Sequence, residues 1–271
     1  VRAPAAALAA LSDRPADAKG VALVPIQRAI EADALRYRHV TVEIDRAKRT
    51  ATFTVRAPAG EQPTTIAQIE AAAAGWWPLE MARELDDAIL SMRTNELDIG
   101  IWLLKTEGDA AAVLATDAVL LAHADHWFVR ETIGLLSRTF SRLDVSSRSL
   151  FALVEPGSCF AGTLLELALA CDRTYMLALP DEPDRAPKLA VSDANFAFYP
   201  MGTGQTRLGR RYGFLQTPMF VPLPVVHAQQ KRSAHNNAAP DRQTTLARLQ
   251  LSPACGQVLE QIFHDVPRRS V

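Results

Sequence analysis

Two short apolar runs, each followed by a stretch with helical character, constrain the fold of this chain most strongly. The runs are residues 99–105, IGIWLLK, and residues 149–155, SLFALVE. Runs this short and apolar are typical of strands buried in a sheet. The stretches that follow them, residues 106–144 and 155–170, each begin with a loop and continue as a helix. This alternation predicts right-handed βαβ crossovers and an α/β fold.

A hairpin and another helix are expected nearer the N-terminus. Residues 40–57 alternate between apolar and polar side chains, with a polar break at residues 45–49, which predicts two antiparallel strands. Residues 78–93 carry apolar side chains at helical spacing. The preceding Trp76 and Trp77 favour a hydrophobic anchor at the start of this helix over an aromatic binding surface. The residues expected in the core are Leu104, Leu153, Leu167 and Ala170.

Composition excludes several classes of function. The 29 Lys and Arg residues nearly balance the 30 Asp and Glu residues, so we expect neither nucleic acid nor an anionic membrane as a partner. No apolar run approaches 18–20 residues, and the N-terminus shows no signal pattern, so we expect a cytoplasmic protein. Cys159, Cys171 and Cys255 are widely spaced and form no metal-ligand set, which favours inert core thiols.

One carboxylate stands in an apolar segment. The segment EPGSCFAGTLLELALACDRTY, residues 155–175, has two glycines in its loop and then an apolar run in which Glu166 is the one charged residue. Because burying an unpaired charge costs several kcal/mol, Glu166 must be paired, desolvated or in a cavity. Two interpretations stay open: a catalytic acid–base residue, or a buried and paired structural carboxylate.

The motif LELALACDRTY, together with the later stretch GTGQTRLGRR at residues 202–211, resembles the crotonase (enoyl-CoA hydratase/isomerase) superfamily. This resemblance implies a ββα spiral with layered sheets and flanking helices. The stretches WWPLEMARELDDAILSMRTNEL, TEGDAAAVLATDA and NFAFYPM are similar to the benzoyl-CoA-dihydrodiol lyase family in particular. Proteins of that family have two crotonase-like halves, and residues 10–212 resemble the second, divergent half, which is mainly structural.

The resemblance also implies site residues. Glu166 occupies the position of the first of two catalytic glutamates. The loops at residues 106–117 and 155–163 would supply an oxyanion hole through the backbone amides of Thr116 and Thr163. The second glutamate would fall at Ser192, and a serine at its ordinary pKa cannot replace a carboxylate base. A complete active site is therefore not expected.

Other candidates favour structural roles. His123 and His126 have the spacing of metal or base residues, but no third ligand lies nearby in the sequence. A partly exposed helix face with Trp127 packed inward is the expected arrangement. Cys159 lies in the loop before the Glu166 helix, where a nucleophile could stand, but no base is assigned to it.

The sequence divides into three parts. Residues 1–36 read as the remnant of a helix and a linker, and residues 37–212 as the crotonase-like domain. Residues 213–271 hold six of the 17 prolines and lack periodicity, so we expect an irregular tail unrelated to the family. The chain therefore resembles a family member truncated at both ends.

The resemblance implies a lyase that opens the ring of a dihydrodiol or epoxide-derived benzoyl-CoA and releases formate. It implies a substrate carried as a coenzyme A thioester, no metal or redox cofactor, and a homo-oligomer for the intact family. For this chain we favour the structural half, with weak or absent acyl-CoA binding and no turnover. The alternatives are an acyl-CoA hydratase or isomerase and a non-catalytic dimerisation or scaffold domain.

Overall fold

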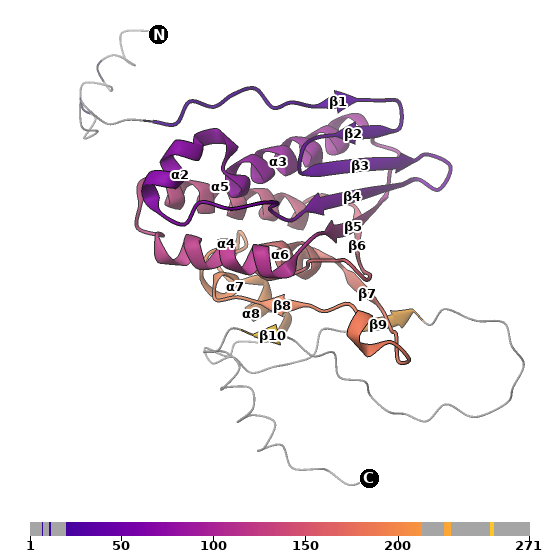
Figure 1. Ribbon diagram of the computed structural model, residues 1–271. Coiled ribbons are helices and arrows are strands. Elements are labelled where there is room, and N and C mark those ends of the chain that lie inside the picture. The colour runs from indigo at the N-terminus through magenta and orange to yellow at the C-terminus, as the bar shows by residue number, and fades with distance from the viewer. Residues whose placement is uncertain (1–6, 8–10, 12–19, 213–224, 229–249, 252–271) are drawn as a thin grey trace, which may run out of the picture.

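The computed structural model describes residues 7, 11, 20–212, 225–228 and 250–251 (Figure 1). Its strands are β1 (Ala29–Ile30), β2 (Ala34–Arg36), β3 (Val40–Asp45), β4 (Thr50–Arg56), β5 (Ile101–Glu107), β6 (Ser149–Val154), β7 (Arg173–Leu177), β8 (Ala190–Val191), β9 (Val225–Ala228) and β10 (Gln250–Leu251). Its helices are α2 (Ile66–Ala72), η1 (Ala73–Gly75), α3 (Trp77–Asn95), α4 (Ala110–Ala122), α5 (Trp127–Asp144), α6 (Gly162–Ala170), η2 (Pro183–Arg185), α7 (Ala194–Ala197) and α8 (Arg207–Tyr212).

β8 and β10 form a separate parallel pair, and one mixed sheet contains the other strands. Its strand order is β1-β2-β3-β4-β5-β6-β7-β9, antiparallel from β1 to β4 and parallel from β4 onward. The predicted hairpin is confirmed, since β3 pairs with β4 and Val42 lies opposite Phe53. The parallel strands β5, β6 and β7 are joined through helices, as βαβ crossovers require. The α/β fold class is therefore confirmed.

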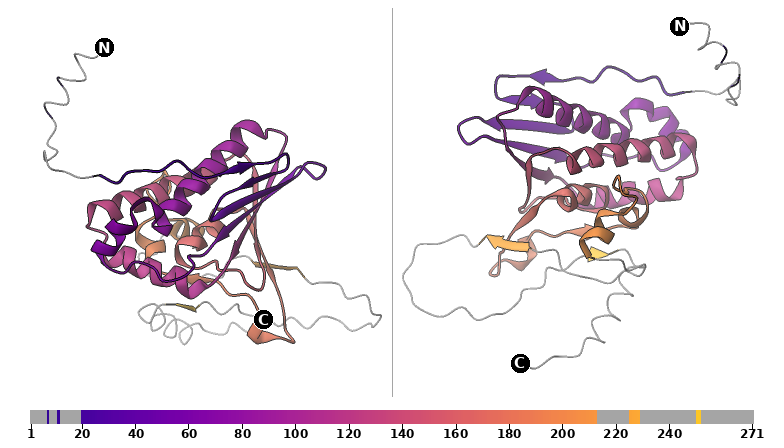
Figure 2. Two further views of the ribbon diagram at one scale, coloured as in Figure 1. Left: turned by 45° about the horizontal axis from the view of Figure 1, so that its top comes forward. Right: turned by 180° about the vertical axis from the view of Figure 1, so that it is seen from behind.

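The α-helices of the described residues, α2 to α8, lie on one face of the sheet (Figure 2). Alternate residues of β4 and β5, including Phe53, Trp102 and Leu104, are buried against this layer. The ring centroids of Phe53 and Trp102 lie 4.8 Å apart. Because side chains in a strand alternate between faces, the remaining residues of β5 point the other way and are half-buried or, for Glu107, exposed. The core therefore lies between the sheet and the helices.

The core prediction is right for two residues of four. Leu104 and Leu167 are buried. Leu153 is half-buried, so its assignment to the core is wrong: Ala152 and Val154 face the helices, and the residue between them faces the opposite side. Ala170, the last residue of α6, is partly buried and packs against the core.

The tandem tryptophans anchor the start of α3, as expected. Trp76 caps the helix and Trp77 is its first residue, and both are buried. The indole Nε1 of Trp77 donates a hydrogen bond to the carbonyl of Arg56 at 3.1 Å. Pro78 stands in the first turn, where its missing N–H costs nothing. This anchor ties α3 to the end of β4.

Residues 106–144 form two helices rather than one long one. His123 follows α4 and His126 precedes α5. The Nε2 atom of His123 lies 3.1 Å from the carbonyl oxygen of Thr64, so the break is held by a contact from a distant part of the chain. The expectation that Trp127 packs inward is wrong. Trp127 is 37% exposed, and its neighbour Phe128, about 100° further round the helix, is buried.

The structure bears on both predicted boundaries of the crotonase-like domain. β1 and β2 lie within residues 29–36, which were expected to be linker; β2 pairs with β3 and buries Ala34 and Leu35, so the sheet begins before residue 37. The predicted tail, residues 213–271, lies outside the described residues except for β9 and β10. Within the described part of the chain, no helix has the length and apolar character needed to cross a membrane.

Candidate functional site

The first turn of α6 is the structural setting of the predicted site. Gly162 opens the helix with a φ of 45°, and the chain enters it through an extended Ala161. A Cβ atom at Gly162 would lie 1.8 Å from the Oδ2 atom of Asp117. Only glycine therefore allows the neighbouring carboxylate to approach the helix this closely. From Gly162 to Leu169 every residue of α6 is buried.

Glu166 is fully buried and paired. Its Oε2 atom accepts a hydrogen bond from Arg207 Nη1 at 3.0 Å, and its Oε1 atom accepts one from Asn195 Nδ2 at 2.7 Å. Arg207 is itself 1% exposed. Both carboxylate oxygens are thus used within the protein. In this structure Glu166 is therefore buried and paired, which is the arrangement that the second interpretation expects.

Burial also changes the protonation of Glu166. Loss of solvent raises the pKa of Glu166 to about 7, while the charge of Arg207 and the hydrogen bond from Asn195 act in the opposite direction. A raised pKa is a common property of a general acid. A general acid must also reach its substrate, and the Glu166 side chain has no exposed surface. Its raised pKa therefore reflects burial rather than access to a reacting group.

A second buried cluster surrounds Asp117, which sequence reasoning missed. The Oδ2 atom of Asp117 accepts the backbone N–H of Thr163 at 2.8 Å and the hydroxyl of Ser192 at 2.6 Å. The Thr163 hydroxyl bonds to the Oδ1 atom of Asp117 and lies 2.6 Å from the Tyr199 hydroxyl. Burial raises the pKa of Asp117 to about 6, opposed by the hydrogen bonds from Ser192 and Thr163. Asp117 is therefore an acceptor for several neutral donors.

The predicted oxyanion hole is not formed in this structure. Asp109 caps α4 by accepting the N–H of Ala111 at 2.8 Å, so the helix begins well before Thr116. Thr116 is the seventh of thirteen helical residues, where the backbone N–H donates within the helix. The other predicted donor, the N–H of Thr163, is bound by Asp117. Neither amide is free to bind a thioester oxygen.

The two clusters form one continuous network. The backbone N–H of Ser192 donates to the Asn195 side chain at 3.0 Å, and Asn195 donates to Glu166. Ser192, at the expected position of the second glutamate, is thus a buried hydrogen-bonding residue. The sequence did carry a signal for Asp117, because it is the one charged residue among the apolar residues of α4.

The remaining candidates lack the features of a reactive site. Cys159 is buried, its N–H donates to the Thr106 hydroxyl at 2.9 Å, and burial raises the pKa of its thiol. A raised pKa disfavours the nucleophilic thiolate. His126 lies 3.5 Å from Glu70. No group of three or more potential metal ligands occurs among the described residues.

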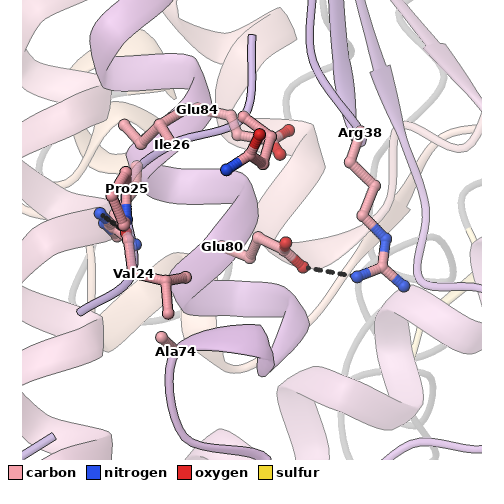
Figure 3. Close-up of a pocket in the computed structure, with 9 residues that line it drawn as sticks. Val24, Pro25, Ile26, Arg38, Ala74, Glu80 and Glu84 are labelled. Atoms are coloured by element: carbon pink, nitrogen blue, oxygen red, sulfur yellow. Dashed lines mark hydrogen bonds and ion pairs between the residues drawn. The ribbon is translucent and has the colours of Figure 1, made fainter. Parts of the chain in front are cut away.

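A pocket lies elsewhere, between the segment before β1 and the first turns of α3 (Figure 3). Its cavity volume is about 190 Å³. Figure 3 shows the Arg38 guanidinium reaching toward Glu80, at 3.3 Å, and Glu84 accepts the backbone N–H of His39 at 2.7 Å. Both carboxylates therefore hold the turn between β2 and β3. The lining residues are Val24, Pro25, Ile26, Gln27, Arg38, Ala74, Glu80, Arg83 and Glu84, and the predicted site residues are not among them.

Comparison with known proteins confirms the sequence resemblance. The benzoyl-CoA-dihydrodiol lyase of Aromatoleum evansii is 54% identical to this chain over 219 residues. The match covers 81% of this chain and 39% of the lyase, so the chain spans well under half the length of the curated relative it matches. The chain is a homologue of that lyase. No family model matches it.

Solved structures with similarity to the chain include enoyl-CoA hydratases and an enoyl-CoA isomerase. An enoyl-CoA hydratase from Geobacillus kaustophilus HTA426 is 20% identical, with 65% of this chain and 57% of that chain covered and a TM-score of 0.39. One from Bacillus halodurans is 18% identical, with 52% and 50% covered and a TM-score of 0.34. Human mitochondrial Δ3-Δ2-enoyl-CoA isomerase is 12% identical, with 59% and 54% covered and a TM-score of 0.36.

Proposed function

We propose that this chain is the structural half of a protein of the benzoyl-CoA-dihydrodiol lyase type and does not itself turn over substrate. The parent reaction would open the ring of a dihydrodiol of benzoyl-CoA and release formate. The observation that carries the proposal is the use of Glu166 inside the protein, where Arg207 and Asn195 bind its two oxygens. The 54% identity to the lyase supports the family assignment.

The chemistry of the reaction explains why Glu166 alone is insufficient. Ring opening requires one group to take the proton of a substrate hydroxyl and a group to return a proton to carbon. With both oxygens bonded and no exposed surface, Glu166 can do neither. The expected partner position holds Ser192, whose hydroxyl donates to Asp117. The same lack of a paired acid and base argues against the hydratase or isomerase alternative.

The proposal also covers the substrate, the oligomeric state and the cellular location of the complete protein. We assign the coenzyme A thioester substrate to the complete protein, with homo-oligomers and no metal or redox cofactor, as the family resemblance implies. The balanced charge of the chain is the reason to expect no nucleic acid. We also place the protein in the cytoplasm. Support for that location comes from Cys159 and Cys171, which are buried and unpaired, whereas disulfides are typical of exported proteins.

Two measurements test the proposal. Isothermal titration of the purified chain with benzoyl-CoA should give no saturable heat. An assay of formate release from the dihydrodiol thioester should give no turnover above a blank, for the wild type and for Glu166→Gln alike. Turnover by the wild type that disappears in a folded Glu166→Gln variant would restore Glu166 as the acid–base residue and reject the proposal.

A further inference from the structure

Three hydrogen-bond donors are directed at the carboxylate of Asp117. The Thr163 N–H and the Ser192 hydroxyl donate to Oδ2, at 2.8 and 2.6 Å, and the Thr163 hydroxyl bonds to Oδ1. The Tyr199 hydroxyl, 2.6 Å from the Thr163 hydroxyl, then donates to Thr163, whose own proton is already used. Three donors thus converge on one carboxylate, and a fourth reinforces one of them.

The setting of these donors is that of an anion site. Thr163 is the second residue of α6, so its N–H has no partner within the helix and stands at the positive end of the helix dipole. The donors come from α6 and from the segment between β8 and α7, and both Thr163 and Ser192 are buried. Gly162 leaves the space that the Oδ2 atom of Asp117 fills. Neutral donors in a buried setting are the usual means of stabilising an oxyanion.

We infer that the first turn of α6 is a carboxylate-binding site whose ligand is the side chain of Asp117, and that this internal ligand closes it to any external acyl group. The inference rests on the proposed function and goes further, because it explains why a thioester would not bind. A thioester oxygen would need the Thr163 N–H, which the carboxylate already holds at 2.8 Å. A full negative charge is also the better acceptor for that N–H.

Removal of the carboxylate should leave a site that a small carboxylate can enter. Asp117→Ala deletes one carboxylate group and retains the β-carbon, so the vacated volume matches formate. We expect this variant to melt at a lower temperature than the wild type at pH 7.5. Sodium formate at 100 mM should raise that temperature by about 3–6 °C over sodium chloride, for a dissociation constant of about 10 mM.

A matched control is Asp109, the N-cap residue of α4, the helix that carries Asp117. Asp109 also accepts a backbone N–H, from Ala111 at 2.8 Å, but it is exposed. Formate should therefore not raise the melting temperature of Asp109→Ala above its value in chloride. In the Asp117→Ala, Ser192→Ala double variant the effect of formate should be weaker, because one donor is lost. An equal effect of formate on Asp109→Ala, or no effect on a folded Asp117→Ala variant, overturns the inference.

A measurement on the wild type covers the case in which Asp117→Ala fails to fold. Amides in the first turn of a helix normally exchange rapidly with solvent, since they lack a helical partner. If Asp117 binds it, the Thr163 amide should exchange at least 100-fold more slowly than an unprotected amide. Rapid exchange at Thr163 overturns the inference. Benzoyl-CoA binding with Thr163 still protected would reject the proposed function and leave the inference intact.

Discussion

The guanidinium of Arg207 lies between two carboxylates that come from different helices. Its Nη1 atom donates to Glu166 at 3.0 Å and its Nη2 atom to Asp144 at 2.6 Å. Glu166 belongs to α6, Asp144 ends α5, and Arg207 begins α8. One side chain thus joins three helices. Because Arg207 and Glu166 are almost completely removed from water, neither charge can be compensated by solvent if the other is lost.

The first prediction concerns this pair. Arg207→Met keeps much of the side-chain volume but leaves Glu166 without its cation, so we expect a loss of about 3–5 kcal/mol in the free energy of unfolding. Urea denaturation at pH 7.5 measures it. Glu166→Gln should cost less, since a neutral amide can still bond to Asn195 and does not leave a buried negative charge.

The control and the double variant sharpen this prediction. Arg210 is exposed on the same helix, so Arg210→Met should leave stability nearly unchanged. The Arg207→Met, Glu166→Gln double variant should be more stable than the sum of the two single losses implies, because the second change removes the charge that the first left unpaired. Strictly additive losses would show that the pair is not coupled.

The elements that position this network were largely predictable. The runs at residues 99–105 and 149–155 correspond to β5 and β6, because apolar character and length are local properties of the sequence. Which faces of the sheet the helices cover is not a local property of the sequence. Both runs read as strands buried on two faces, whereas the described helices lie on one face, so Leu153 is only half-buried.

The site itself was predictable only in part. An isolated charge in an apolar helix indicated that Glu166 is paired, desolvated or in a cavity, and in the structure it is buried and paired. Its partner Arg207 is 41 residues away, and no periodic pattern connects the two. The same argument applied to Asp117 would have found the second cluster. Whether the Thr116 amide is free depends on where α4 begins. The capping side chain of Asp109 determines that start, and it places Thr116 inside the helix.

A second prediction compares two glycines with positive φ. Gly162 has a φ of 45° and Gly157 a φ of 87°, so alanine is strained at both. At Gly157 no other atom lies within 4 Å of an added Cβ, whereas at Gly162 the Asp117 carboxylate lies 1.8 Å away. Gly157→Ala should therefore cost about 1–2 kcal/mol of stability from backbone strain. Gly162→Ala should cost about 2–5 kcal/mol, because overpacking adds to the strain.

The measurement is again the free energy of unfolding, with far-ultraviolet circular dichroism to verify that both variants are folded. Gly162→Ala should also increase exchange of the Thr163 amide, since Asp117 must move to admit the methyl group. Equal losses for the two variants would mean that Asp117 does not occupy the space beside Gly162.

The last prediction is a pH dependence of stability that Asp117 and Glu166 cause in the same direction. Burial raises the pKa of Asp117 from 3.8 to about 6 and that of Glu166 from 4.5 to about 7. Between its unfolded and folded pKa, each group holds more protons in the native state than in the unfolded chain. Stability therefore falls as pH rises through the window, because stability rises with pH only where the unfolded state binds more protons.

Urea denaturation from pH 4 to pH 8 can isolate each group by difference. The free energy of unfolding of the wild type minus that of Asp117→Asn should decrease between pH 4 and about pH 6 and then level off. The corresponding difference for Glu166→Gln should continue to decrease to about pH 7. Titration of Glu166 is common to the wild type and Asp117→Asn, so it largely cancels from the first difference. A difference that increases with pH would show that the hydrogen bonds around Asp117 outweigh its burial and lower its pKa.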